Sequence, residues 1–223
     1  MLGAAWIVAR KDLAIELRTR SAFLSVVVFT LLGLVIFFFA WDATAVSPLD
    51  LAPGVLWVTF TFAALLGLHR SFSVETQDRA MDALLVAPLE RESIYVGKAI
   101  ANVIFVGAVL LVAVPAVALF YNLPLARALL ALGLVAALAA IGLVSVGTLF
   151  SAMAVNTRMA ELLLPMLSLP FFVPVVIASA QASTMLLAGR PVSEALPWLK
   201  ILLAFDIIFA VACAMAFPHT LEE

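Results

Sequence analysis

Six long apolar runs, separated by short polar segments, form the dominant pattern along the chain. A helix rises 1.5 Å per residue, so about 20 apolar residues cross the roughly 30 Å hydrocarbon core of a bilayer. The pattern therefore predicts an all-α, polytopic membrane protein, built as a single domain over residues 1–223. The six expected transmembrane helices are 21–41, 51–68, 98–120, 129–150, 161–181 and 198–217.

The residues before the first span predict a helix that lies in the membrane interface. Leu2, Trp6, Ala9, Leu13 and Leu17 recur at helical spacing on one face, with charged residues on the others. Residues 1–20 therefore suit an interfacial helix with Trp6 at headgroup depth. The alternative is a solvated start of the first span. A cleaved signal peptide is disfavoured, because the apolar run exceeds the about 7–15 residues of a signal sequence.

Composition agrees with lipid as the main solvent. Hydrophobic residues make up 66% of the chain and charged residues 12%, with a mean hydropathy of +1.23. In a soluble domain, about 45–50% of residues are hydrophobic and about 25% are charged. The net charge of −2 shows no basic footprint for nucleic acid. The single cysteine, Cys213, has no intrachain disulfide partner and no metal-binding spacing, so we interpret it as an apolar filler.

The distribution of basic residues predicts the orientation. Nine Lys and Arg residues fall on one side of the expected spans and three on the other. The nine are Arg10, Lys11, Arg18, Arg20, Arg70, Arg79, Arg91, Lys98 and Arg158; the three are Arg127, Arg190 and Lys200. By the positive-inside rule, both termini and the polar segment 69–97 are expected in the cytoplasm.

The polar segment 69–97 predicts a cytoplasmic coupling element between the second and third spans. Residues 75–87 suit a short helix, because Glu75 and Asp78 complement the positive end of its dipole. A second helical stretch is expected to begin at 90–92 and to run into the third span. The predicted element is thus a pair of short helices that links two spans.

An apolar stripe on the first of these helices indicates a docking surface. Met81, Leu84 and Leu85 lie at i, i+3 and i+4, and Pro88 ends the helix. The charges of residues 69–98 sum to −1, with four basic and five acidic side chains. A lipid-binding helix would be more basic, so a protein partner is favoured. The alternative is a loop that packs on its own bundle.

These residues resemble a known family. The run ETQDRAMDALLVAP from Glu75 to Pro88, followed by Gly97-Lys98, resembles the pattern E-x-x-x-G-[ST]-L-E-x-L-L-x-x-P…G-K of ABC exporter permeases. The run LLLPMLSLPFFVPVVI from Leu162 to Ile177 is similar to the proline-rich run of the CcmB-type haem exporter B family. The chain departs from the pattern at Arg79-Ala80, where relatives carry Gly-Thr or Gly-Ser.

The resemblance implies an ABC-2 exporter-like fold and a permease role in bacterial cytochrome c maturation. The coupling helix would dock on a separate P-loop ATPase in the cytoplasm, beneath the inner membrane. Met81, Leu84 and Leu85 would be the anchors, with Glu75, Asp78 and Asp82 setting register. The resemblance also implies a second copy of the chain and other maturation membrane proteins as partners. ATP would be bound by the ATPase, and haem is a possible cargo; no cofactor is expected on this chain.

Two features inside the spans carry candidate chemistry. Pro165, Pro170 and Pro174 each remove a helical hydrogen bond, which makes a regular fifth span unexpected. We expect either a flexible pathway wall or a re-entrant packing feature. Asp206 lies near the middle of the sixth span, where an ionised carboxylate costs about 2.5–3.5 kcal/mol. It should face the bundle, a water-filled cavity or a partner, or be protonated.

Polar and small residues of the other spans are candidates for contacts inside the bundle. Candidate polar neighbours of Asp206 are Asn102, Ser145 and Thr148. The glycines of the fourth span are expected to allow close helix packing. They are Gly133, Gly142 and Gly147.

Several catalytic motifs are missing from the sequence. It contains no P-loop, no G-x-S-x-G elbow and no HExxH, so we predict a non-catalytic subunit without a metal site. Two alternatives stay open. One is an ABC-2-type exporter of another small molecule or lipid-linked substrate. The other is an intramembrane enzyme or proton-linked carrier that uses Asp206.

Overall fold

The described part of the chain is built from helices. The computed structural model describes residues 2–77, 91–155 and 160–220. Its helices are α1 (Leu2–Thr19), α2 (Ser21–Ala40), α3 (Pro48–Gln77), α5 (Arg91–Phe120), α6 (Leu125–Val155), α7 (Ala160–Leu187) and α8 (Val192–Thr220). The predicted all-α class is confirmed.

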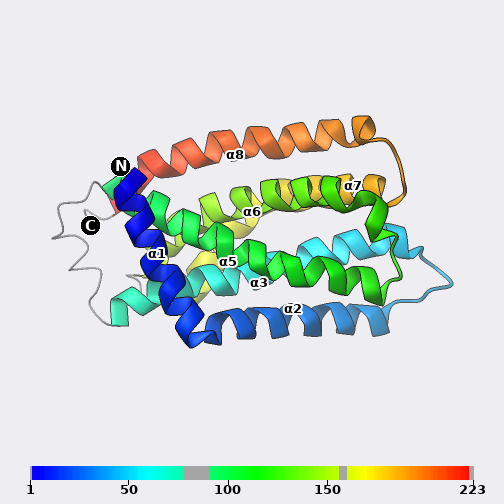
Figure 1. The fold of residues 1–223 in the computed structure, drawn as a ribbon, viewed down its shortest axis with the longest axis horizontal. Helices are drawn as coiled ribbons and strands as arrows, with labels where there is room; N and C mark the ends of the chain where they lie inside the picture. Colours follow the sequence, from blue (N-terminus) through cyan, green and yellow to red (C-terminus); the bar gives the residue numbers. More distant parts are fainter. Residues whose placement is uncertain (1, 78–90, 156–159, 221–223) are drawn as a thin grey trace.

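Six of these helices, α2 to α8, are long and apolar enough to cross a membrane. They run side by side along the long axis of one bundle, and both chain termini lie at the same end (Figure 1). The shorter α1 crosses that end obliquely (Figure 1). The number of spans is as predicted, and the chain is a multi-pass membrane protein.

The helices extend beyond the apolar runs that predict them. The run 51–68 becomes α3, which continues to Gln77, and the run 98–120 becomes α5, which starts at Arg91. Outside the hydrocarbon core, polar residues can continue a helix, so hydropathy alone underestimates its length. The helical stretch expected from 90–92 into the third span is confirmed. The separate helix expected to begin at Glu75 is not: Glu75 lies in the last turn of α3.

The face of α1 that packs on the bundle is mostly distinct from the apolar stripe predicted to lie in the interface. Ala5, Val8 and Ala9 are buried, whereas Trp6 and Leu17 of the predicted apolar stripe are 55% and 72% exposed. Small side chains let α1 approach the bundle closely, and the bulky ones are left facing outward. Exposed Trp6 and Leu17 suit a helix in the membrane interface.

The main hydrophobic core joins α2, α3, α5, α6, α7 and α8, and a second, smaller cluster around Leu34, Leu56 and Val117 joins α2, α3 and α5. The central helix is α3, with 72% of its apolar window buried against 22% for α2. Inside the core, the indole of Trp57 donates a hydrogen bond of 3.0 Å to Ser183 Oγ and so connects α3 with α7. The outer face of α2 exposes large apolar side chains, including Phe39 at 81%, as expected when lipid is the solvent.

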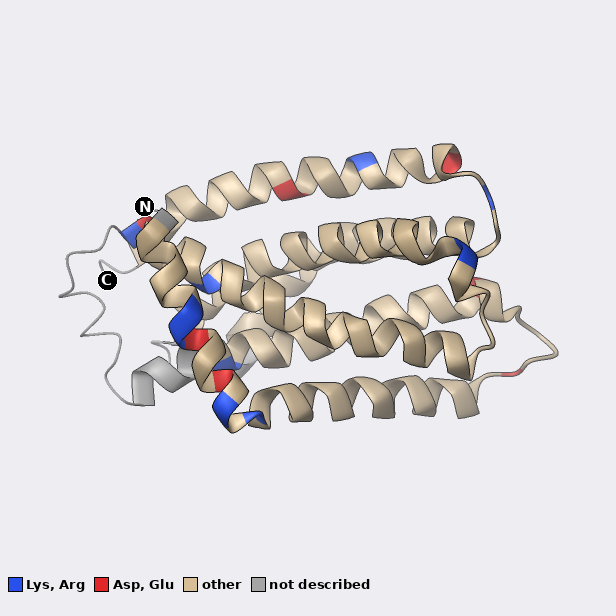
Figure 2. Ribbon diagram, in the orientation of Figure 1, with Lys and Arg blue, Asp and Glu red and all other residues tan. Residues whose placement is uncertain are grey.

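Charged residues gather at the ends of the bundle. Figure 2 shows them concentrated on α1 and nearby helix ends, while the middle of the bundle is almost free of them. The end that carries α1 is also the end from which the chain leaves α3 and re-enters at α5 (Figure 1). The ends of the predicted coupling segment therefore lie beside the polar end of the bundle.

Candidate functional site

Most of the predicted coupling residues lie outside the described part of the chain. These are Asp78, Met81, Asp82, Leu84, Leu85 and Pro88, all within residues 78–90. Glu75 is placed in the backbone of α3, in its last turn. The structure therefore describes the two helices that hold the segment, and their contacts are the starting point for the site.

The first of these contacts is a close crossing of α1 and α5 at Gly97. A Cβ atom at this position would lie 2.6 Å from the carbonyl oxygen of Ala5 and 2.7 Å from Cβ of Val8. Only a residue without a side chain allows the two helices to approach this closely. Gly97, the last residue of the predicted coupling segment, therefore places α1 against the start of α5.

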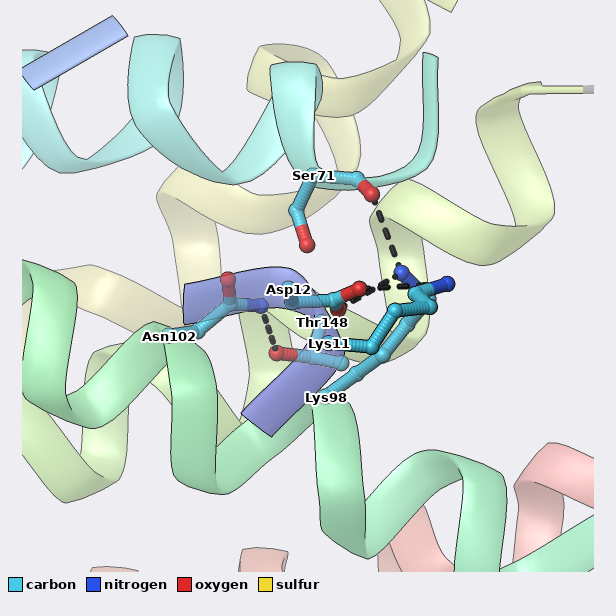
Figure 3. Close-up of polar contacts among 6 residues, drawn as sticks. All are labelled: Lys11, Asp12, Ser71, Lys98, Asn102 and Thr148. Carbon is cyan, nitrogen blue, oxygen red and sulfur yellow. Dashed lines mark hydrogen bonds and ion pairs between the residues drawn. The ribbon is translucent and has the colours of Figure 1, made fainter. Parts of the chain in front are cut away.

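The next residue, Lys98, connects three helices. Its side chain is fully buried, and Nζ lies 3.1 Å from Oδ2 of Asp12 in α1. Nζ also donates a hydrogen bond of 3.0 Å to the backbone carbonyl of Ser71 in α3 (Figure 3). Asp12 is further contacted by Lys11 Nζ at 3.2 Å. We call Asp12, Ser71 and Lys98 the lysine node.

The lysine node has an electrostatic reason to be rigid. A buried ammonium loses its hydration, which costs several kcal/mol unless charge and hydrogen-bond partners replace the water. Asp12 supplies the opposite charge, and the Ser71 backbone carbonyl of α3 supplies a hydrogen-bond acceptor. Moving α1 or α3 away from α5 would break these contacts and cost free energy. The ends of the three helices are therefore expected to move as one unit.

On either side of Lys98, α5 is tied to α6 by two hydrogen bonds. Asn102 Nδ2 donates to Thr148 Oγ1 at 3.1 Å (Figure 3), and Tyr95 Oη donates to the Ser145 carbonyl at 2.9 Å. Asn102 and Thr148 are thus committed to each other. Neither these two residues nor Ser145, all predicted as polar neighbours of Asp206, forms a hydrogen bond with it.

Asp206 faces the bundle, as the cost of exposing a carboxylate to lipid predicts. It is only 5% exposed, and neither carboxylate oxygen has a hydrogen-bond partner within the described ranges. A Cβ at Gly142 of α6 would lie 2.8 Å from Oδ1, so Gly142 provides the space for this carboxylate.

The close-packing role predicted for the α6 glycines holds at two of the three positions. Gly142 packs against α8 in this way, and a side chain at Gly147 would collide with Leu68 of α3. Among the described residues, a Cβ at Gly133 would meet no atom within 4 Å, so the prediction is wrong there.

The fifth span is not broken by its prolines. Pro165, Pro170 and Pro174 all lie within the continuous helix α7, and the span crosses the bundle rather than re-entering. Pro170 and Pro174 are on the exposed side of α7, away from the core. The helix persists because proline disrupts only local backbone bonds, which a membrane bundle tolerates where neighbours compensate. Any pathway along these prolines would run on the outer face of this chain.

The described ranges also bear on metal binding and on the cysteine. No group of three or more His, Cys, Asp or Glu residues there could hold a metal ion. Cys213 is buried, as expected for an apolar filler.

Comparisons with known proteins agree with this architecture. The profile of the CcmB protein family matches residues 3–223. Heme exporter protein B of Bradyrhizobium diazoefficiens is 32% identical over 217 residues, which cover 96% of each chain. The protein of the same name from Pseudomonas aeruginosa is 30% identical over 74% of this chain and 75% of its own.

A third relative matches over a shorter stretch. Heme exporter protein B of Rhodobacter capsulatus is 34% identical over 59% of this chain, and the match spans 60% of its own length. Because the family profile covers nearly the whole chain and two longer relatives are similar across most of it, this chain belongs to the CcmB protein family.

Proposed function

We propose that this chain is the membrane permease subunit of a haem-export ABC complex for cytochrome c maturation. The observation that carries the proposal is the family match over residues 3–223, with relatives named heme exporter protein B. The chain contains no P-loop, so ATP hydrolysis belongs to a separate ATPase subunit. In this role the chain performs no catalysis itself. It sits in the bacterial inner membrane with both termini in the cytoplasm.

The lysine node supports a coupling role for the segment between α3 and α5. A docking segment transmits force only if it is attached to something rigid, and both of its flanking helices are attached to α1 through Lys98. Closure of the ATPase would then displace α1, α3 and α5 together. The complex would include the ATPase, a second copy of this chain and other maturation membrane proteins, and it would drive haem export or release of a haem-loaded chaperone.

The docking step is tested by placing a charge on the predicted apolar stripe. Leu84→Asp and Leu85→Asp are each expected to abolish co-purification with the ATPase and to remove stimulated ATP hydrolysis, because a carboxylate cannot enter an apolar groove without losing its hydration. Ala83→Asp adds the same charge on the opposite side of the predicted helix and should leave both intact. Full assembly with either leucine variant would contradict the docking role.

The carboxylate of Asp206, which has no hydrogen-bond partner among the described residues, favours one rival function, a proton-linked carrier. The permease proposal expects Asp206→Asn to keep ATPase assembly and to restore c-type cytochromes in a deletion strain, since asparagine keeps the shape and removes the charge. Haem-stained c-type cytochromes and ATPase co-purification are the measurements. Loss of the cytochromes from a variant that still assembles would favour the carrier. An ABC-2-type exporter of another substrate would instead leave the deletion strain with normal c-type cytochromes.

A further inference from the structure

A cleft opens beneath α1 at the polar end of the bundle. It has a volume of about 250 Å³ and lies among α1, α2, α3 and α5. Its polar lining includes Asp12, Glu16, Arg70, Ser71 and Asn102, and Phe105 contributes an apolar wall. Typical small-molecule sites measure about 300–1,000 Å³, so this one suits a group smaller than a drug-sized ligand.

Two opposite charges in this cleft have no ion-pair partner within the described ranges. Arg70 Nη2 donates a hydrogen bond of 2.6 Å to Ser21 Oγ, which leaves other guanidinium N–H groups available. Glu16 Oε1 accepts a hydrogen bond of 2.7 Å from the backbone N–H of Phe23. The two side chains line the same cleft without forming an ion pair with each other.

The third charged residue that lines the cleft, Asp12, is already paired. Asp12 contacts both Lys98 and Lys11. The cleft therefore presents one available cation and one available anion, each held in place by a neutral hydrogen bond. Such a pair is complementary to a zwitterion, and a purely anionic ligand would meet repulsion from Glu16.

The position of the cleft indicates where such a ligand comes from. It lies under α1, which exposes Trp6, a residue enriched at membrane–water interfaces. Leu13, Ile15 and Ala22 line it beside the polar groups, so its wall changes from charged to apolar. That change matches the junction of a phospholipid headgroup with its glycerol and acyl chains.

We propose that this cleft binds the headgroup of a zwitterionic aminophospholipid, of the phosphatidylethanolamine class. Arg70 binds the phosphate, for which a guanidinium is well suited. Glu16 accepts hydrogen bonds from the primary ammonium, and the acyl chains begin along Ile15 and Phe105. The bound lipid bridges α1 and α3, and it thereby secures the interfacial helix to the bundle.

The proposal is tested by lipid binding to the delipidated full chain in detergent. Native mass spectrometry measures the affinity for short-chain phosphatidylethanolamine, for phosphatidylglycerol and for free phosphoethanolamine. The wild type is expected to prefer phosphatidylethanolamine over phosphatidylglycerol by about tenfold, the equivalent of one charge-assisted hydrogen bond. Free phosphoethanolamine is expected to bind far more weakly, because it lacks the apolar part.

Substitutions separate the two halves of the headgroup site. Glu16→Gln keeps an acceptor for the Phe23 N–H but should remove the preference between the two lipids. Arg70→Gln should weaken both lipids, and Arg70→Lys should retain them. Arg190→Gln, in the exposed Arg190–Glu194 pair between α7 and α8, is the control and should bind as wild type.

Three results would overturn the proposal. They are equal affinity of the wild type for the two lipids, an unchanged preference in Glu16→Gln, and unchanged binding by Arg70→Gln. Phosphoethanolamine that binds as tightly as the lipid would overturn the assignment of the ligand to the membrane. None of these readouts depends on the ATPase, so they are independent of the proposed function.

Discussion

Asp12→Asn is expected to lower the free energy of unfolding by about 3 kcal/mol, because it removes the charge that faces a fully buried ammonium. Asparagine keeps the shape of the side chain, so the loss measures charge and not packing. Thermal or denaturant unfolding in detergent provides the measurement. The effect is large because the side chain of Lys98 is 0% exposed, so water cannot replace the charge that Asp12 supplies to its ammonium group.

The double variant Asp12→Asn, Lys98→Met separates stability from coupling. Methionine removes the buried charge, so most of the lost stability should return, as it does when a buried ion pair is replaced as a whole. With the node gone, ATP hydrolysis in the assembled complex should lose its stimulation. Glu194→Gln breaks the exposed Arg190–Glu194 pair of 3.6 Å and should cost only about 0–1 kcal/mol. If Asp12→Asn costs no more than this control, the lysine node does not hold the helices together.

Gly97→Val is the second substitution expected to have a large effect. A side chain here would occupy the space of the Ala5 carbonyl and the Val8 side chain, so α1 must move away from α5. Overpacking of this kind costs about 1–3 kcal/mol. Released α1 should also be cut faster by trypsin at Arg10 and Arg18, which are both exposed. Unfolding temperature and the rate of this cleavage are the two measurements.

Gly107→Val provides the matched control for the Gly97 substitution. It lies on the same helix, and a Cβ there meets no atom within 4 Å. This variant should unfold within about 0.5 kcal/mol of the wild type and be cut by trypsin in α1 at the wild-type rate. Equal cleavage rates for the two variants would show that the crossing at Gly97 does not retain α1.

Much of the candidate site could not be predicted from the sequence. The pattern ending in Gly97-Lys98 marks both residues, but nothing in it indicates that Lys98 reaches Asp12, 86 positions earlier. Asn102 and Thr148 were both reasonable partners for Asp206, since all three are polar residues in apolar spans. Their pairing with each other depends on how α5 rotates against α6, and helix rotation follows from packing across the whole bundle.

The fold itself depends on properties that can be read locally along the chain. The thickness of the hydrocarbon core requires long apolar runs, so the number and approximate positions of the spans follow from the sequence. The tertiary structure alone determines the surroundings of Lys98, Asp206 and the buried face of α1, because residues distant in the chain form them. The packing of the bundle decides which helix faces meet. It therefore also decides whether a buried charge lies beside a partner, lacks one or faces a glycine.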